Sequence, residues 1–577
     1  MDSFSSHLRP HRLCIICRGE LIERRDLVLA ILSTSQSYFG HTKPFYIPPL
    51  GPAARFVTLQ AHKSGPISRL ICRTPNCHVC SQSDIDFLLC HYTCLLVLQK
   101  HVYQLDSIDP VLEIVFRTGS FFNPWPLART DYDMSDGPEM PLGRSPPPKD
   151  EDLPWVHMIN QLNRLLPELQ KMVQAYCAES EFWRVWKAMA WPKDIHTIKQ
   201  ETRSVGELGV WKRGLTFGPK STEKFLLISV DGMGIKEVEY TDTRPTDRRK
   251  SANVWYTFLE TTTVQHIQAT LKDGRIRLSL KPPDLVLWDT PVIPDLRHCH
   301  LFGASARFNR LRVIQLENLV GLTFFVGGGL LYAIHSHYDP ENSALETFLR
   351  IPDWRRKRLV WLFLPVAEGI EYLWLRTRKG ANGQMAEPSL LFQNLQGKIL
   401  TTGLYHEDSA AYTCRNLSSR PTKLVYDQPY PGEPILTFGA MPSAVARHDV
   451  FVPKYNLGDK MEIYTSDAPL QSVCKVQLYL ESDETCRGIL LHYHDGKQRV
   501  LGQSRGDLIC QKFSNPVGLH FQNCRNYVRV FISLQRGDMD KAGTGNYDTI
   551  DFASEKVQHV LWLFNSEYDE IVRVENH

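Results

Sequence analysis

Closely spaced cysteines and a histidine near the start of the chain are the residues best suited to a specific chemistry. Seven of the 14 cysteines lie within the first 94 residues. Two residues separate Cys14 from Cys17, and two separate His91 from Cys94. This spacing lets a short turn direct two donors at one tetrahedral Zn²⁺ ion. The four residues together predict a complete set of zinc ligands.

Three more cysteines, Cys72, Cys77 and Cys80, form a second and less defined group. Cys77 and Cys80 repeat the two-residue spacing, and Cys90 or His78 would complete their set. The group predicts either further ligands at one shared zinc site or a second zinc ion. Because a closed set of four donors leaves no open position, we expect a structural metal. Its binding energy would stabilise a module that has little core of its own.

A disulfide framework is the alternative for cysteines at this spacing. The segment Met1–His7 lacks a charged start followed by an apolar core, so it predicts no secretory signal. We therefore expect an intracellular location, cytoplasmic or nuclear. Intracellular cysteines are kept reduced, which favours metal ligands over disulfides.

A helix is predicted to carry the second pair of ligands. Residues 85–105 hold enough apolar side chains for a helix, on which His91 and Cys94 would share a face at i and i+3. A CxxC turn early in the chain and a ligand pair on a later helix are typical of treble-clef-like zinc modules.

The remainder of the 577-residue chain divides by composition, and its length predicts three or four domains. Clustered prolines predict a linker. After the linker, apolar side chains recur at three- and four-residue steps, which predicts a helix with a kink at Pro167. Short β-rich runs between turn residues begin near residue 205. The predicted fold class is α+β, mainly β, with tandem prism- or sandwich-like domains. The expected segments are a Cys/His-rich zinc module at 11–118, a proline-rich linker at 119–152, a helical segment at 153–204, a β-rich segment at 205–300, a β-prism-like domain at 301–445 and a second β-rich domain at 446–577.

Two short internal echoes suggest that the last two domains are related. The stretch at 321–328 is echoed at 488–496, where each predicts a strand that enters a glycine turn. Val360–Phe363 is echoed by Leu561–Phe564. Coincidence is the alternative, since short buried strands look alike.

The order of features resembles a group of large filamentous-fungal proteins with an N-terminal Cys/His module and C-terminal β-rich domains. The stretches that carry the resemblance are His91–Cys94, Phe225–Tyr240 and Cys486–Tyr493. The resemblance covers most of the chain and implies a zinc-like module, but it implies no defined activity.

Residues 313–440 are also similar to a jacalin-type β-prism lectin unit. The similarity lies in Gly321–Phe324, Ile334–His337, Leu364–Ile370 and Thr402–Gly403. It implies a β-prism fold, and it makes glycan binding an alternative function.

Other classes of function are disfavoured by charge and by local context. A formal net charge of +3 predicts neither nucleic-acid nor membrane binding. Residues 502–506 match G-x-S-x-G, but a strand rather than a helix is expected after Ser504, so a nucleophile elbow is not predicted. Three H-x-H pairs, at His298, His335 and His492, lack an identifiable third ligand.

The leading hypothesis is therefore a non-enzymatic intracellular binding or scaffold protein with a structural zinc module and a protein partner. One alternative is a carbohydrate-binding, lectin-like protein. The other is an enzyme whose site is assembled from scattered residues that the sequence does not reveal.

Overall fold

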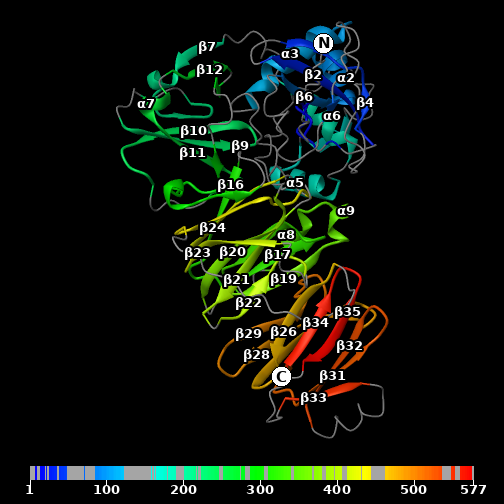
Figure 1. The fold of residues 1–577 in the computed structure, drawn as a ribbon. Coiled ribbons are helices and arrows are strands. Elements are labelled where there is room, and N and C mark those ends of the chain that lie inside the picture. Colours follow the sequence, from blue (N-terminus) through cyan, green and yellow to red (C-terminus); the bar gives the residue numbers. More distant parts are fainter. Residues whose placement is uncertain are drawn as a thin grey trace, which may run out of the picture. The chain divides into compact units, whose positions relative to one another are not determined.

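The computed structural model forms two compact units and is mainly β, which confirms the predicted α+β class with tandem β-rich domains (Figure 1). Unit 1 comprises residues 1–293 and 307–310, and unit 2 comprises residues 294–306 and 311–577. The structure describes residues 7–8, 13–19, 21, 25–34, 38–47, 70–71, 85–122, 157–158, 161–162, 164–177, 180–189, 191, 200–215, 218, 223–245, 251, 253–264, 266–272, 274–279, 286–303, 310–339, 343–366, 369–379, 385–395, 397–405, 412–429, 432–443, 462–535, 547–552 and 559–574.

A small antiparallel sheet and two helical segments make up the first part of unit 1. Strand β2 (Leu27–Thr34) pairs with β3 (Tyr38–His41), β4 (Phe45–Tyr46) and β6 (Ile85–His91). Helix α2 (Tyr92–Val97) follows β6 directly and continues as the π-helical η1 (Leu98–Tyr103). Helix α3 (Ile108–Gly119) completes the module. Its core includes Ile16, Val28, Leu89, Leu95 and Val111.

The prediction of a helix over residues 85–105 is wrong for its first third. Residues Ile85–His91 form a strand, and the helix begins only at Tyr92. All seven of these residues pair with β2, from Ile85 opposite Thr34 to His91 opposite Val28. A short apolar run suits a buried strand as well as a helix, and here pairing with a distant strand decides between them.

The helical segment contains two described helices, α5 (Pro167–Tyr176) and α6 (Glu181–Met189). The predicted kink at Pro167 is wrong, because Pro167 is the first residue of α5. At that position a backbone N–H would have no partner within the helix, so proline loses no hydrogen bond. Trp183 and Trp186 on α6 are buried and stack at 5.3 Å. The predicted linker lies outside the described residues from residue 123 onward, whereas Ser120–Phe122 form a buried 3₁₀ turn, η2.

Two sheets pack as a sandwich in the last part of unit 1. Their shared core includes Trp211, Leu226, Val238, Trp255 and Ile276. One sheet has the order β13 (Arg275–Leu278), β12 (Gln268–Lys272) and β7 (Glu201–Ser204). Within unit 1 the other has the order β14 (Leu287–Trp288), β11 (Trp255–Glu260), β9 (Phe225–Asp231), β10 (Gly234–Thr241) and β8 (Trp211–Lys212).

The first half of unit 2 is a prism in which three sheets enclose one core. Leu424, Phe324 and Phe392 represent the three sheets in that core. The first sheet has the order β15 (Phe302–Gly303), β25 (Thr437–Met441), β24 (Lys423–Asp427) and β16 (Arg310–Gln315). The second has the order β18 (Leu330–His337), β17 (Gly321–Gly327) and β19 (Val360–Pro365). The third has the order β22 (Ile399–Thr401), β21 (Met385–Asn394), β20 (Ile370–Lys379) and β23 (Tyr412–Ser419).

The second half of unit 2, drawn from orange to red in Figure 1, is again all β. Its buried residues, among them Val476, Leu491 and Trp562, join the core of the first half in one cluster. One sheet has the order β26 (Tyr464–Pro469), β34 (His559–Phe564) and β35 (Asp569–Val574). The other strands are β27 (Val473–Leu480), β28 (Cys486–Tyr493), β29 (Gln498–Gly502), β30 (Ile509–Ser514), β31 (Gly518–Asn523), β32 (Val528–Ser533) and β33 (Asp548–Asp551).

One of the two predicted internal echoes survives in this topology. The stretches at 321–328 and 488–496 both form the first strand of a hairpin that turns through glycine, β17–β18 and β28–β29. The second echo does not mark two strands in equivalent positions of their sheets. Val360–Phe363 lies in β19 and pairs with β17, whereas Leu561–Phe564 lies in β34 and pairs with β26 and β35.

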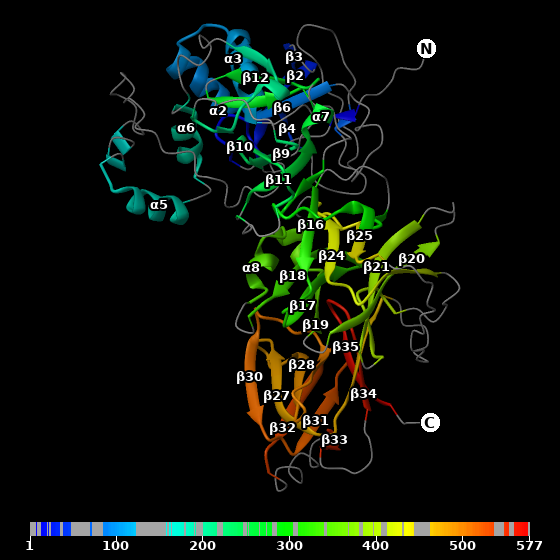
Figure 2. The same cartoon turned by 90° about the vertical axis from the view of Figure 1, so that its left-hand side faces the viewer.

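Helix α8 (Leu345–Leu349) covers one face of the β17–β19 sheet (Figure 2). The short helix α9 (Asp353–Arg356) follows it. Phe348 of α8 packs on Phe325 and Trp361. The basic run that begins at Arg355 contributes to this packing, because the Arg355 guanidinium lies 4.4 Å from the centre of the Tyr332 ring. Among the described residues, no helix is long and apolar enough to cross a bilayer.

Candidate metal centre

The first ligand pair lies on a tight turn that backbone hydrogen bonds shape. The Cys14 N–H donates to the Gly19 carbonyl and the Arg18 N–H donates to the Cys14 carbonyl, each at 2.9 Å. Arg18 adopts a left-handed conformation with φ of 58°, which lets the chain reverse immediately after Cys17. The Gly19 N–H then lies 3.3 Å from the Cys17 sulfur. The turn therefore directs both sulfurs to one side.

The second ligand pair lies where β6 becomes α2. His91 is the last residue of β6 and the N-cap of α2, and Cys94 follows in the first helical turn. The Ile15 N–H donates to the Leu89 carbonyl at 2.8 Å, which fixes the Cys14 turn against β6. The His91 N–H reaches the Cys14 sulfur at 3.3 Å. A strand followed by a helix thus brings the two pairs together.

Four donor atoms from Cys14, Cys17, His91 and Cys94 lie within 4.8 Å of one another, and all four residues are buried. His91 Nδ1 is 3.4 Å from the Cys17 sulfur and 3.7 Å from the Cys94 sulfur. In a tetrahedral zinc site with Zn–S near 2.3 Å, ligand atoms are separated by roughly 3.5–3.8 Å. The donor types and their separations therefore fit Zn²⁺ without a large rearrangement.

Electrostatics in the metal-free cluster favour one buried ion pair. Burial would raise the pKa of Cys14, but hydrogen bonds from Cys17 and Cys94 and the charge of His91 lower it well below its ordinary value. Burial acts against the charged form of His91, yet hydrogen bonds and charges from Cys14 and Cys17 raise its pKa to about 10. The pKa of Cys17 is raised first by burial, and that of Cys94 first by its hydrogen bond to Cys14. A divalent cation would have to displace the protons of Cys17, His91 and Cys94, so its affinity rises with pH.

A carboxylate behind His91 completes the arrangement. Asp26 Oδ2 lies 3.4 Å from His91 Nε2, and Asp26 Oδ1 accepts from Arg184 Nη1 of α6 at 2.6 Å. With Nε2 facing the carboxylate, Nδ1 is the ring nitrogen left to face the sulfurs. Carboxylate–histidine–metal relays of this kind fix the tautomer and orientation of a ligating imidazole. The Cys94 sulfur also lies 3.9 Å from the Arg184 carbonyl, so α6 contacts the cluster twice.

Replacing Asp26 by Asn should weaken zinc binding about 10–100-fold, because the amide removes the negative charge that orients and polarises His91. Competition with a chromophoric zinc chelator would measure the change. The matched control is Asp109→Asn, since Asp109 lies 3.6 Å from His41, which is not one of the four donors. Equal zinc affinities for Asp26→Asn and the unmodified protein would contradict the assigned role of Asp26.

Of the other predicted ligands, only Cys90 lies within the described residues, and it is not part of this cluster. Cys72, Cys77 and Cys80 lie outside the described residues, so a second ion at that group stays a prediction. Cys90 is buried, but its thiol donates to the Leu29 carbonyl at 3.6 Å and is not among the four donors. Within the described part of the chain, no H-x-H pair belongs to a group of three or more metal-ligating side chains.

The G-x-S-x-G stretch has a packing role in the structure. It follows β29 and leads through a turn into strand β30, so the strand–turn–helix context of a nucleophile elbow is missing. Gln503 is buried, where its side chain accepts from the Trp361 N–H at 3.2 Å and donates to the Asn565 carbonyl at 3.3 Å. The bond from Trp361 links the first half of unit 2 to the second, and the bond to Asn565 lies within the second half.

Sequence reasoning missed Asp26 and Arg184. Neither stands at a spacing that relates it to the cysteines, and no local pattern indicates that α6 packs beside α2. Their place in the site is visible only once β2, β6 and α6 are assembled.

Comparisons with known proteins add little to this geometry. No protein-family profile matches the chain, and no curated protein matches it. Among solved structures, the chain is similar to the second β-prism domain of RbmC from V. cholerae, at 15% sequence identity and a TM-score of 0.16. The match covers 24% of this chain and 95% of that domain. The prism description of unit 2 rests on its own strand pairing.

Proposed function

We propose that the protein is a non-enzymatic intracellular binding or scaffold protein whose N-terminal module is held by one structural zinc ion. The observation that carries the proposal is the buried cluster of Cys14, Cys17, His91 and Cys94. Three thiols and one imidazole complete a four-coordinate shell, and a shell without an open position suits a structural ion. The resemblance to filamentous-fungal proteins with a Cys/His module agrees with this role and stays a prediction.

The zinc would tie together elements that are far apart in the sequence. It would join the Cys14 turn to the junction of β6 and α2, and through Asp26 it would steady α6. Arg18, between Cys17 and Gly19, also donates to the Gly232 carbonyl at 3.0 Å, in the turn between β9 and β10. One ion would therefore stabilise the contact of the module with the β-sandwich of unit 1.

The metal content of the purified full-length protein tests this proposal. We expect one zinc ion per chain by elemental analysis if only the described cluster is filled, and two if the group around Cys77 binds its own ion. A strong chelator should remove the metal and expose the amides of residues 85–116 to hydrogen exchange. Protein that contains no zinc, with a module that a chelator leaves protected, would overturn the proposal.

Carbohydrate binding by the first prism of unit 2 is the second candidate function. What supports it is the three-sheet prism together with a pocket of about 170 Å³ between β15 and strands β20 and β23. Apolar and hydroxyl-bearing side chains line this pocket, a combination that suits a sugar ring. A glycan array on which the full-length protein shows no signal above background would count against it.

A further inference from the structure

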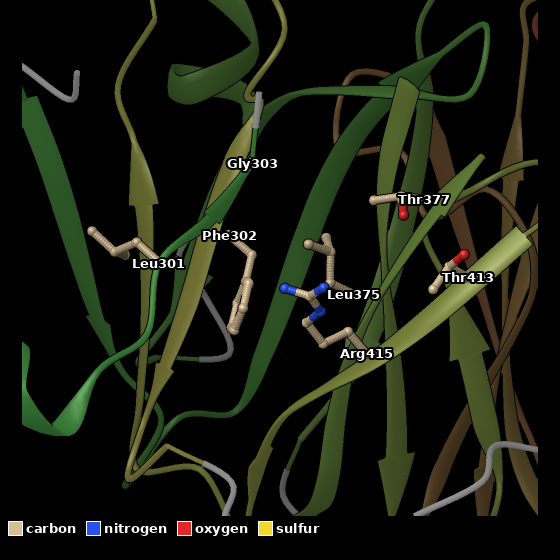
Figure 3. Close-up of a pocket in the computed structure, with 7 residues that line it drawn as sticks. All are labelled: Leu301, Phe302, Gly303, Leu375, Thr377, Thr413 and Arg415. Atoms are coloured by element: carbon tan, nitrogen blue, oxygen red, sulfur yellow. The ribbon is translucent and has the colours of Figure 1, made fainter. Parts of the chain in front are cut away.

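The pocket in the first prism is built on two directly paired strands (Figure 3). Leu375 of β20 lies opposite Arg415 of β23, and Thr377 lies opposite Thr413. Side chains at alternate positions of a strand share a face, so these four form one patch. Phe302 and its neighbours Leu301 and Gly303 make the other wall.

The polar members of this patch lie where the core-facing side of the two strands reaches solvent. Leu373 and Leu375 on β20 and Leu417 on β23 are core residues, and the face then continues with Thr377, Arg415 and Thr413. Thr377 is only 5% exposed. Thr413 is half-buried and Arg415 is exposed, so the polar side chains of the patch line the solvent-facing mouth of the pocket.

Three polar side chains of the pocket are available to a ligand. Among the residues that the structure describes, Thr377, Thr413 and Arg415 make no side-chain hydrogen bond or ion pair. The Arg415 guanidinium carbon lies 4.6 Å from the centre of the Phe302 ring. Figure 3 shows Arg415 and Phe302 side by side within the pocket. Packing on a ring holds a guanidinium in place while its N–H groups stay free for hydrogen bonds.

The chemistry of the lining defines the ligand. A guanidinium recognises a carboxylate through two parallel N–H···O bonds, and the threonine hydroxyls can exchange hydrogen bonds with ligand hydroxyls. Leu301, Leu375 and Phe302 supply apolar contact. A volume of about 170 Å³ is close to the ~150 Å³ of an engineered cavity that binds benzene, which is the scale of one six-membered ring.

We propose that this pocket binds an acidic monosaccharide unit of the hexuronate class, with its carboxylate at Arg415 and ring hydroxyls at Thr377 and Thr413. The inference rests on the carbohydrate-binding candidate and narrows it to sugars that carry a carboxylate. Recognition of the carboxylate depends on Arg415 alone, so the preference for an acidic sugar can be tested separately from sugar binding.

Calorimetric titration of the full-length protein with glucuronate, glucose and acetate tests the proposal. Glucuronate should bind at least tenfold more tightly than glucose, because a hydrogen bond to a charged group is worth about a tenfold change in affinity or more. It should also bind more tightly than acetate, which has the carboxylate but lacks the ring and its hydroxyls. Arg415→Gln should remove the advantage over glucose, and Thr413→Val should weaken glucuronate and glucose together. Arg529→Gln is the matched control, since Arg529 also lies over an aromatic ring, Tyr527, but lines no part of the pocket.

The outcomes separate this proposal from the broader one. If glucose binds as tightly as glucuronate, the assignment of an acidic sugar fails while carbohydrate binding stands. If acetate binds as tightly as glucuronate, the pocket recognises a carboxylate alone, and the proposal that it binds a sugar is overturned. Binding of none of the three ligands by folded protein would overturn both, as would glucuronate binding that Arg415→Gln and Arg529→Gln reduce equally.

Discussion

Replacing Cys94 by serine should yield protein without bound zinc at the described cluster, with an unfolded N-terminal module and a folded unit 2. Serine is a poor zinc ligand, so the set falls from four donors to three. In small zinc domains the ion supplies about 10–16 kcal/mol of apparent folding free energy, which is as large as the roughly 5–15 kcal/mol net stability of a whole domain. Hydrogen exchange should therefore rise across residues 85–116 and stay low in β27 and β28. Elemental analysis of the same sample would report the lost zinc.

Cys90→Ser is the matched control for this experiment. Cys90 is as buried as the ligands and lies next to His91, but its sulfur points to the Leu29 carbonyl rather than to the cluster. The control should keep both its zinc and its protection. Because the pKa values of Cys17, Cys94 and His91 are raised in the metal-free cluster, zinc should also be held more weakly at pH 6 than at pH 8. Loss of zinc from Cys90→Ser but not from Cys94→Ser would refute the assigned ligand set.

Arg487→Met is expected to destabilise unit 2 by about 3–5 kcal/mol, because it leaves one member of a buried ion pair without its partner. Arg487 Nη1 donates to Asp569 Oδ2 at 2.7 Å, and the Asp569 side chain is fully buried. Trp562 Nε1 donates to the other carboxylate oxygen at 2.9 Å. Chemical denaturation would measure the loss in the free energy of unfolding. Hydrogen exchange of the amides in β34 and β35 would locate that loss in unit 2.

The pH dependence of this variant identifies the carboxylate as the cause. Burial raises the pKa of Asp569 to about 7 even with Arg487 opposite it. A carboxyl group with a folded pKa above its unfolded value favours the fold at low pH, and that contribution is lost as the pH rises through the folded pKa. Removing Arg487 raises this pKa further, so the gap between Arg487→Met and the unmodified protein should be wider at pH 8 than at pH 5. Asp569→Asn in the same chain should narrow the gap at pH 8, and a gap that is equal at both pH values would rule out this explanation.

The metal cluster was predictable because its information is local. A two-residue spacing of donors is compatible with only a few turn geometries, so Cys14 and Cys17 can be paired without knowing the fold. The pairing of that turn with His91 and Cys94 was a choice among several cysteines. In the structure it depends on the hydrogen bond from the Ile15 N–H to the Leu89 carbonyl, which sets the turn against β6. Asp26 and Arg184 could not be predicted, since their positions depend on how β2 and α6 pack around the cluster.

The tandem β architecture was predictable from the many short strands and turns, but the path of each strand was not. Leu561–Phe564 and Val360–Phe363 carry nearly the same residues and occupy different sheet positions, because hydrophobicity fixes burial and not the neighbouring strand. The pocket in the first prism was missed for a related reason. Thr377 and Arg415 look like ordinary polar positions until the registry of β20 and β23 places them at the end of a buried face.

The spacing of the two ligand pairs bears on the order of events during synthesis and on tolerance to insertion. Cys17 and His91 are 74 positions apart, so the first pair leaves the ribosome well before the second and cannot capture an ion in a closed shell until Cys94 has emerged. Closing a loop of this length is entropically unfavourable, but each further doubling adds only about 0.6 kcal/mol. Insertions between the two ligand pairs should therefore destabilise the fold little, provided that β2 and β6 still pair.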